Sequence, residues 1–170
     1  DGCWGAGLVA KFSDEVIRAV VAKAQYSEPG AAEHIARTLI ARRDKVLRTW
    51  LTGINPLADA RLGPGGALAF ENAAVTAGVA SAPAAYRLTW SAFDNTAGQA
   101  VGESYEMRVA AAAAVAPPAV LAGDFVRVSV TTEHPDHPAW SAPITFTFRR
   151  APGTWDPVGV DRQIPLRTGA

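Results

Sequence analysis

The sequence predicts an α+β protein in which a helical segment precedes an antiparallel β-structure. Two observations carry this prediction. Apolar residues recur at helical spacing through residues 1–57, and from about residue 67 they alternate with polar residues, as in half-buried strands. The stretch 58–66 is rich in glycine and is predicted to be a linker. We therefore expect a multi-domain chain with a helical hairpin at 1–57, a β-sandwich at 67–161 and a tail at 162–170.

The helical segment is predicted to begin in the apolar stretch "CWGAGLVAKF" and to continue as two longer helices. Ser13 is a suitable N-cap for the first, because its hydroxyl can accept from the free amides of the first turn. Ser27 is predicted to cap the second, with Pro29 in the first turn, where a missing N–H costs nothing. Gly53 and the following "NPL" are predicted to end it. Its apolar stripe comprises Ile35, Leu39, Ile40, Val46, Leu47, Trp50 and Leu51.

Strict alternation predicts strands in the second half. The four clearest strands cover residues 86–90, 104–109, 126–131 and 144–149, with outer strands at 68–72 and 155–160 and a weaker one at 74–79. About seven short strands separated by turn residues are typical of an immunoglobulin- or fibronectin-like β-sandwich. Trp90 is its candidate core tryptophan, and the alanine-rich stretch 110–118 is predicted to cross between strands because it ends in two prolines.

Composition and net charge limit the classes of function that we expect for this chain. Hydrophobic residues make up 49% and charged residues 19%, which suits a packed core. Sixteen basic and sixteen acidic residues give a formal net charge of zero, so nucleic acid is not an expected partner. No apolar run approaches the roughly 20 residues of a membrane span. Cys3 is the single cysteine, so no internal disulfide forms, and a small core residue is its default role.

Motifs for catalysis are missing from the chain. There is no glycine-rich phosphate loop, no G-x-S-x-G, no H-E-x-x-H and no C-x-x-C. We therefore expect no enzyme active site contained within these residues, and no cofactor.

The segment "TEHPDHPAW" at 132–140 is the first candidate binding site. His134, Asp136 and His137 are of types that bind zinc, and Trp140 is a possible stacking surface for a sugar or peptide. Two prolines prevent the histidines from sharing a helical face, and a metal needs three or four converging ligands. The alternative is a proline-rich turn between strands, with Trp140 packed beneath it.

A basic run on the second long helix is the second candidate. Arg42, Arg43 and Arg48 form a positive face, joined by Arg37 and Lys45, that could hold phosphate, nucleic acid or acidic lipid. The alternative is a solvated helix face, or a buried arginine–aspartate pairing to an absent domain. Glu33 precedes Arg37 by four residues and Asp44 precedes Arg48 by four, both favourable pairs.

The segment "FDNTAGQ" is the third candidate. Asp94, Asn95 and Gly98 could supply oxygens to calcium, but the spacing of an EF-hand loop is absent. Turn chemistry alone accounts for this composition between two strands.

The stretch 12–57, from "FSDEVIRAVV" to "WLTGINPL", is distinctive, and with "YRLTWSAFDN" and "HPAWSAPITFTFRR" it resembles the C-terminal region of large uncharacterised bacterial proteins. The resemblance covers roughly residues 4–160. It implies a tail module preceded by an exported N-terminus and a kinase-like region, hence an exported or periplasmic location. No site residue follows from it. Because the chain begins with Asp1 rather than Met, we also expect a fragment or processed product of a larger protein.

Three functional hypotheses follow. The first is a non-catalytic structural or interaction module whose helices dock onto an upstream domain of the same polypeptide. It predicts an exposed apolar patch around Trp4, Val20 and Trp50. The second is a ligand- or metal-binding β-sandwich that uses the 133–140 loop. The third is an accessory part of a larger, kinase-like enzyme, with the arginine face near phosphate.

Overall fold

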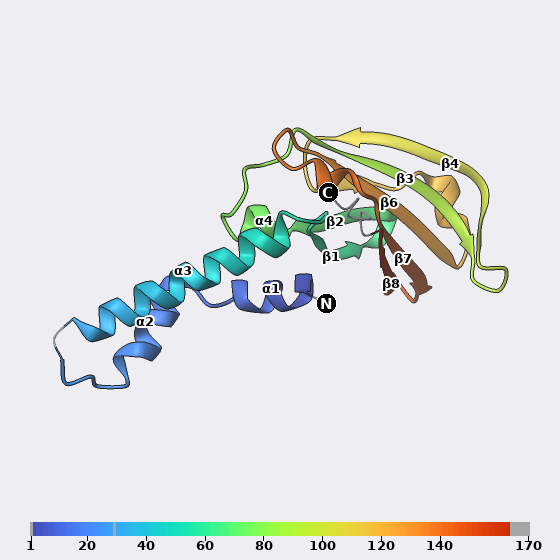
Figure 1. Ribbon diagram of the computed structural model, residues 1–170. Coiled ribbons are helices and arrows are strands. Elements are labelled where there is room, and N and C mark those ends of the chain that lie inside the picture. The colour runs from blue at the N-terminus through green and yellow to red at the C-terminus, as the bar shows by residue number, and fades with distance from the viewer. Residues whose placement is uncertain (1, 29, 164–170) are drawn as a thin grey trace.

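The computed structural model describes residues 2–28 and 30–163, and within α1 the side chain of Cys3 lies outside this description. The described part of the chain is α+β, with four α-helices and two antiparallel sheets of three and five strands. Figure 1 shows a helical hairpin that extends away from the two sheets. We call residues 2–51 the hairpin and residues 55–163 the β body.

The first arm of the hairpin is broken into two helices, α1 (Gly2–Ala10) and α2 (Asp14–Ala22), and the second arm is the long helix α3 (Ala31–Leu51). Both short helices pack against α3, and α2 lies at the end far from the sheets (Figure 1). The predicted cap is confirmed, because the Ser13 hydroxyl accepts from the backbone N–H of Val16 at 3.2 Å.

The predicted start of the second long helix is wrong. Helix α3 begins at Ala31 and not after Ser27, and its N-cap is Gly30 with φ of +86°. Glycine adopts this left-handed backbone without steric cost, so the chain turns sharply into α3 there. Pro29, expected in the first turn, lies outside the described residues.

The smaller sheet has the order β1-β2-β5, from β1 (Leu57–Leu62), β2 (Ala67–Asn72) and β5 (Ala113–Val115). The prediction of a linker at 58–66 is therefore wrong for residues 58–62, which form a strand. The turn that follows includes a 3₁₀ segment, Pro64–Gly66. Gly66 has φ of +81°, and a Cβ there would lie 2.7 Å from Leu121 Cδ1.

The weak strand predicted at 74–79 is also wrong, because α4 (Ala73–Thr76) occupies its first half and a turn follows. The side chain of Asn72 accepts from the amides of Ala74 and Val75 and so caps this helical turn.

The larger sheet has the order β4-β3-β6-β7-β8 and is antiparallel throughout. Its strands confirm the four clear alternations and the outer strand at 155–160. Their bounds are β3 (Ala85–Asp94), β4 (Gln99–Val109), β6 (Phe125–Glu133), β7 (Ile144–Ala151) and β8 (Thr154–Arg162). The predicted crossing at 110–118 links β4 to β6 through β5 in the other sheet, and a 3₁₀ turn, Pro118–Ala122, completes it. Arg162, placed in the tail by the sequence, belongs to β8.

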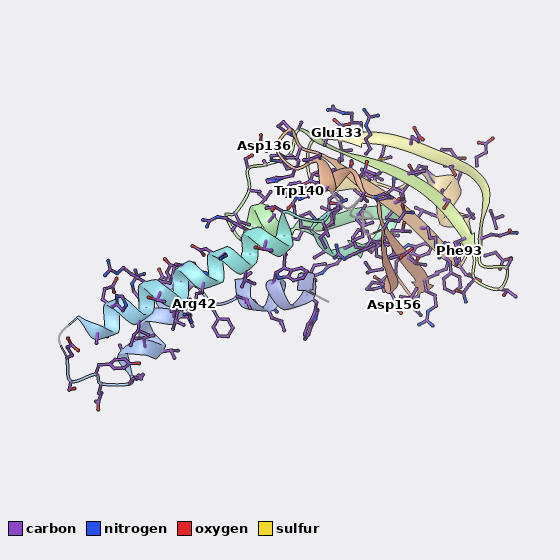
Figure 2. All side chains as sticks on the ribbon, in the orientation of Figure 1. Arg42, Phe93, Glu133, Asp136, Trp140 and Asp156 are labelled. Carbon is purple, nitrogen blue, oxygen red and sulfur yellow. The ribbon has the colours of Figure 1, made fainter. Side chains whose placement is uncertain are left out.

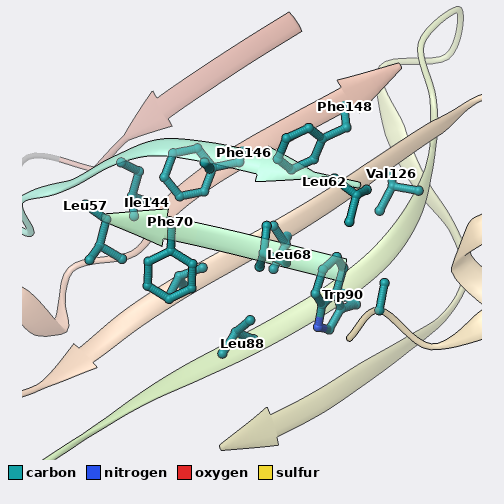
Figure 3. Close-up of a cluster of buried hydrophobic side chains, with 14 of the residues drawn as sticks. Leu57, Leu62, Leu68, Phe70, Leu88, Trp90, Val126, Ile144, Phe146 and Phe148 are labelled. Atoms are coloured by element: carbon teal, nitrogen blue, oxygen red, sulfur yellow. The ribbon is translucent and has the colours of Figure 1, made fainter. Parts of the chain in front are cut away.

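The two sheets share one apolar core. Leu62, Leu68 and Phe70 come from the smaller sheet, and Trp90 and Phe148 are among those contributed by the larger one (Figure 3). Trp90 is fully buried, as predicted. Burial of large apolar side chains stabilises a fold by about 1.5–3 kcal/mol each, so this core holds the sheets together.

A second apolar cluster joins the hairpin to the β body. Ala6 of α1 and Leu47 and Leu51 of α3 pack with Ala74 of α4 and with Trp140. Just beyond α3, the buried side-chain amide of Asn55 donates to the carbonyl oxygens of Val130 and Ala142 at 3.1 and 3.0 Å. The near end of the hairpin is therefore fixed to strand β6 and to the segment just before β7, whereas its far end projects from the molecule (Figure 1).

Candidate functional site

The 133–140 loop is a turn between β6 and β7, and its buried histidine finds its hydrogen-bond partners within the protein. His134 is buried, its Nδ1 accepts from the backbone N–H of Asp136 at 3.1 Å, and its Nε2 lies 3.0 Å from the hydroxyl of Ser81. These partners place the proton on Nε2, which donates to Ser81. A 3₁₀ turn, Pro138–Ser141, then carries the chain toward β7. Both ring nitrogens of His134 are thus occupied within the protein.

The aromatic rings of this loop stack on one another. The ring of His137 lies 4.4 Å from that of His134 and 4.5 Å from that of Trp140, centroid to centroid. Trp140 is 0% exposed, so its interpretation as a surface stacking platform is wrong. Figure 2 shows that Trp140 lies near the end of α3, while Asp136 lies at the outer edge of the β body.

The structure does not assemble a metal centre from this loop. Within the described ranges, no group of three or more histidine, cysteine, aspartate or glutamate side chains could hold a metal ion. Burial, and then the neighbouring His134, lower the pKa of His137, against an opposing effect of Asp136. The neutral imidazole is favoured because burial disfavours the charged form by more than Asp136 stabilises it.

Beside the loop lies an open depression of about 720 Å³. Residues on its walls include Arg87, Thr131, Glu133, His134, His137 and Ser141. Of the predicted site residues, His134 and His137 therefore line the depression, whereas the buried Trp140 is not among its lining residues.

An ion cluster on this wall was not visible in the sequence. Arg87 of β3 and Arg108 of β4 are directly opposed in the sheet, and both donate to the carboxylate of Glu133, with Arg108 Nη2 at 2.8 Å. Hydrogen bonds from Arg108 and then from Arg87 lower the pKa of Glu133. Like charges opposed across two strands repel, so the carboxylate between them reduces the repulsion and leaves the three side chains with a net charge of +1. The cluster depends on strand register, which no local pattern specifies.

The arginines on the basic face of α3 differ in exposure and in ion pairing. The side chain of Arg43 is 14% exposed. Its guanidinium donates hydrogen bonds to the carbonyl oxygen of Phe12 at 2.7 Å, to the carboxylate of Asp14 at 2.6 Å and to that of Asp44 at 2.8 Å. Burial lowers the pKa of Arg43, but the hydrogen bonds and attraction to Asp44 and then to Asp14 together outweigh burial and raise this pKa. The predicted arginine–aspartate pairing exists, but its partners lie in this hairpin. Arg42 and Arg48 are exposed and make no ion pair within the described residues.

The "FDNTAGQ" segment is a turn between β3 and β4. The carboxylate of Asp94 accepts from the amides of Thr96 and Ala97 at 2.8 and 3.0 Å, and Gly98 has φ of +70°. This carboxylate holds its own turn, in agreement with the interpretation based on turn chemistry. The proposed role of Cys3 concerns a side chain outside the described residues.

Most of the exposed large apolar side chains of the described residues lie on the hairpin. Among the described residues, thirteen large hydrophobic side chains are exposed, nine of them in the hairpin, and the other four are all valines. The hairpin members are Trp4, Leu8, Phe12, Val16, Val20, Tyr26, Leu39, Val46 and Trp50. The predicted exposure of Trp4, Val20 and Trp50 is confirmed, at 70%, 65% and 49%. Contiguous exposed apolar surface commonly marks an interaction site.

None of the described helices is long and apolar enough to cross a membrane. No family model, curated protein or solved structure matches the chain.

Proposed function

We propose that this chain is a non-catalytic interaction module, in which the hairpin is the docking element and the β body is its support. The observation that carries the proposal is the exposure of aromatic and aliphatic side chains along both arms of the hairpin. The two sheets of the β body share one buried apolar core, and outside the hairpin the only large apolar side chains exposed among the described residues are four valines.

The finer architecture is part of the same proposal. We assign the β body to the immunoglobulin- or fibronectin-like β-sandwiches, supported by two antiparallel sheets that share one core. The hairpin is assigned as a separate domain, supported by the packing of α1 and α2 on α3 and by a cluster distinct from the core of the two sheets, through which the hairpin contacts the β body. Such a rigid support positions the hairpin without taking part in chemistry.

The setting we propose is the C-terminal part of a larger bacterial protein, with the hairpin available to an upstream domain of the same polypeptide. Trp4 and Trp50 support this setting because a Cβ at Gly2 would overlap the ring of Trp50, which places both tryptophans at one end of the hairpin. Tryptophan is enriched at the energetic centres of interfaces, where water is excluded from both partners.

The test is oxidative footprinting of tryptophan in the purified 170-residue chain and in the complete gene product that contains it. We expect Trp4 and Trp50 to oxidise readily in the chain and to be protected in the complete product. The buried Trp90 and Trp140 should be protected in both and serve as internal controls. Equal reactivity of Trp4 and Trp50 in the two samples would remove the docking proposal.

One observation favours ligand binding as a second candidate. The 720 Å³ depression beside the 133–140 loop has a size typical of small-molecule sites and carries the guanidinium of Arg87 and the ring of His137 on its wall. A small anion is the class of ligand that this wall would favour. Isothermal titration with acetate and phosphate, compared between the chain and its Arg87→Ala variant, tests it. Binding that is unchanged by the substitution, or no binding, counts against this candidate.

A further inference from the structure

We propose that the 133–140 loop is a pH-sensitive switch at the base of the hairpin: protonation of His134 and His137 releases the hairpin from the β body, and the hairpin then pivots about residues 52–54. The inference goes beyond the proposed function and does not depend on what the hairpin docks onto. It is supported by the position of the two rings, by the hydrogen bonds of His134, by the surrounding charges, and by an attachment at Asn55 that does not titrate.

Both histidines pack against the side chain that joins the hairpin to the β body. Trp140 lies in one apolar cluster with Leu47 and Leu51, near the end of α3 (Figure 2). The ring of His137 lies 4.5 Å from the ring of Trp140, and the ring of His134 lies 4.9 Å from it in an edge-to-face arrangement. A movement of the two imidazoles therefore alters the contact between Trp140 and the hairpin.

The turn that carries these rings requires a neutral His134. Its Nδ1 accepts from the backbone N–H of Asp136, and its Nε2 faces the hydroxyl of Ser81. A protonated imidazole has a hydrogen on both ring nitrogens, so Nδ1 can no longer accept. Two donors then face each other, and the amide of Asp136 has to move away from the ring. Because the 3₁₀ turn that holds Trp140 begins two residues later, this movement displaces Trp140.

The loop itself does not compensate two positive charges. The ring centroids of His134 and His137 are 4.4 Å apart, so two imidazolium ions would repel each other. Asp136, the acid between them in the sequence, is exposed to solvent. Burial, and then His134, lower the pKa of His137 against the effect of Asp136, in agreement with this balance of charge.

The neighbouring elements do not supply a free acid either. On the wall of the depression, Glu133 is already shared between Arg87 and Arg108. Helices α1 and α4 and the segment 77–84 contain no Asp, Glu, Lys, Arg or His. Helix α3 contacts the loop through apolar side chains, and the charged residue beside them is the basic Arg48. Protonation of both histidines therefore adds positive charge that none of these elements offsets.

The attachment of the chain just beyond α3 is independent of pH in this range. The side-chain amide of Asn55 donates to two backbone carbonyl oxygens of the β body, and its Oδ1 accepts from the hydroxyl of Thr132 at 2.9 Å. Neither an amide nor a hydroxyl titrates between about pH 5 and 8, so Asn55 stays in place when the histidines are protonated. Residues 52–54, between α3 and Asn55, form a bend and are the point about which a released hairpin turns.

The β body keeps its own core during this change. The cluster between the two sheets includes Trp90, which is fully buried, and it includes neither of the two histidines nor Trp140. Release of the hairpin is therefore a local opening, which removes one apolar contact and leaves the sheets packed together. It exposes Trp140 and not Trp90.

The test is oxidative footprinting of tryptophan in the 170-residue chain at about pH 8 and about pH 5, on either side of the usual pKa of histidine. We expect Trp90 and Trp140 both to be protected at the higher pH. At the lower pH, oxidation of Trp140 should rise at least about tenfold while Trp90 stays protected, since a shift of one pKa unit in one histidine changes the opening equilibrium by that factor.

The double variant with His134→Gln and His137→Gln cannot be protonated at these positions and should keep Trp140 protected at both pH values. His34→Asn, at the exposed histidine of α3, is the matched control and should behave like the wild type. If the double substitution itself loosens the turn and exposes Trp140 at both pH values, His137→Gln alone decides, because it keeps the hydrogen bonds of His134. That single variant should show a smaller rise than the wild type at the lower pH.

Two results with the wild type alone would overturn the proposal. Protection of Trp140 at both pH values would mean that the hairpin stays in place, and equal exposure of Trp90 and Trp140 at the lower pH would mean that the whole chain unfolds. A full acid-induced rise in His137→Gln or in the double variant would mean that other groups respond to acid. Loss of the rise in His34→Asn would equally overturn the assignment.

Discussion

The guanidinium of Arg43 lies 2.6 Å from the carboxylate of Asp14 and so joins the long helix to the start of α2. The same side chain donates to the carbonyl oxygen of Phe12, in the break between α1 and α2. One arginine therefore holds the first arm of the hairpin against the second at the point where that arm changes direction. Much of the stability of the hairpin should depend on it.

Arg43→Met is expected to lower the free energy of unfolding by about 1–2 kcal/mol, because hydrogen bonds from a largely buried charged group are lost and Asp14 is itself half exposed. Arg42→Met is the matched control, one residue earlier and exposed, and it should change stability by no more than about 0.5 kcal/mol. Urea denaturation followed by circular dichroism measures both. Equal effects of the two substitutions would contradict the role given to Arg43.

Trp140→Ala is expected to lower the free energy of unfolding by about 3–5 kcal/mol, since it removes a fully buried ring between the hairpin and the β body. Amide hydrogen exchange should also become faster at the end of α3, where Leu47 and Leu51 contact the ring. Trp4→Ala, at a tryptophan that is mostly exposed, should leave unfolding of the monomer nearly unchanged. A small effect of Trp140→Ala would mean that another contact anchors the hairpin.

Stability is expected to fall as the pH drops below about 6.5, the pKa of an unperturbed histidine. The pKa of His137 is lowered in the folded state by burial and by His134, so between the two pKa values the unfolded chain binds more protons. The stabilisation is therefore complete above the unfolded pKa and is lost as the pH falls through this window.

Urea midpoints between pH 5 and 8 measure this dependence, and His137→Asn should flatten it. His34→Asn, on the exposed surface of α3, is the control. Glu133, whose pKa is lowered by its two arginines, loses its contribution only in the more acidic range below the pKa of an ordinary carboxyl, so the two effects separate. A profile that is the same in wild type and His137→Asn would contradict the assignment.

Zinc in large excess is expected to leave the melting temperature unchanged. The ring nitrogens of His134 are occupied by Ser81 and Asp136, and His137 has no third ligand from the described residues. A ligand that bound the folded state would raise the melting temperature by mass action. A rise that disappears in His137→Ala would show that the loop rearranges around a metal.

The strands were predictable where apolar and polar residues alternate strictly, because one face of each strand lies on the core. Strand β1 escaped prediction because Asp59 has φ of +50° and the register shifts between Ala58 and Arg61, which interrupts the alternation. Strand β5 consists of alanine and valine, within a run whose composition also suits a helix. Residues 73–76 look like a strand by composition, but the side-chain cap of Asn72 starts a helical turn there.

The candidate site was predictable only in part. Composition alone indicated that the 133–140 loop and the arginines of α3 were candidate binding sites. The burial of Trp140 depends on Ala6, Leu47 and Leu51, which lie far away in the sequence and reach it only through the fold. The exposure of Trp4 and Trp50 was predictable from the hypothesis that the hairpin docks onto something else, and not from the periodicity of their helices.

Arg162, at the end of β8, donates to the carbonyl oxygens of Asn55 and Leu57 at 2.7 Å each. The chain therefore enters and leaves the β body at neighbouring points. A unit with adjacent entry and exit can be spliced into a surface loop of an unrelated protein without stretching either side. Residues 55–162 thus have the geometry of a transplantable cassette, and a host carrying them would also show whether this half folds without its hairpin.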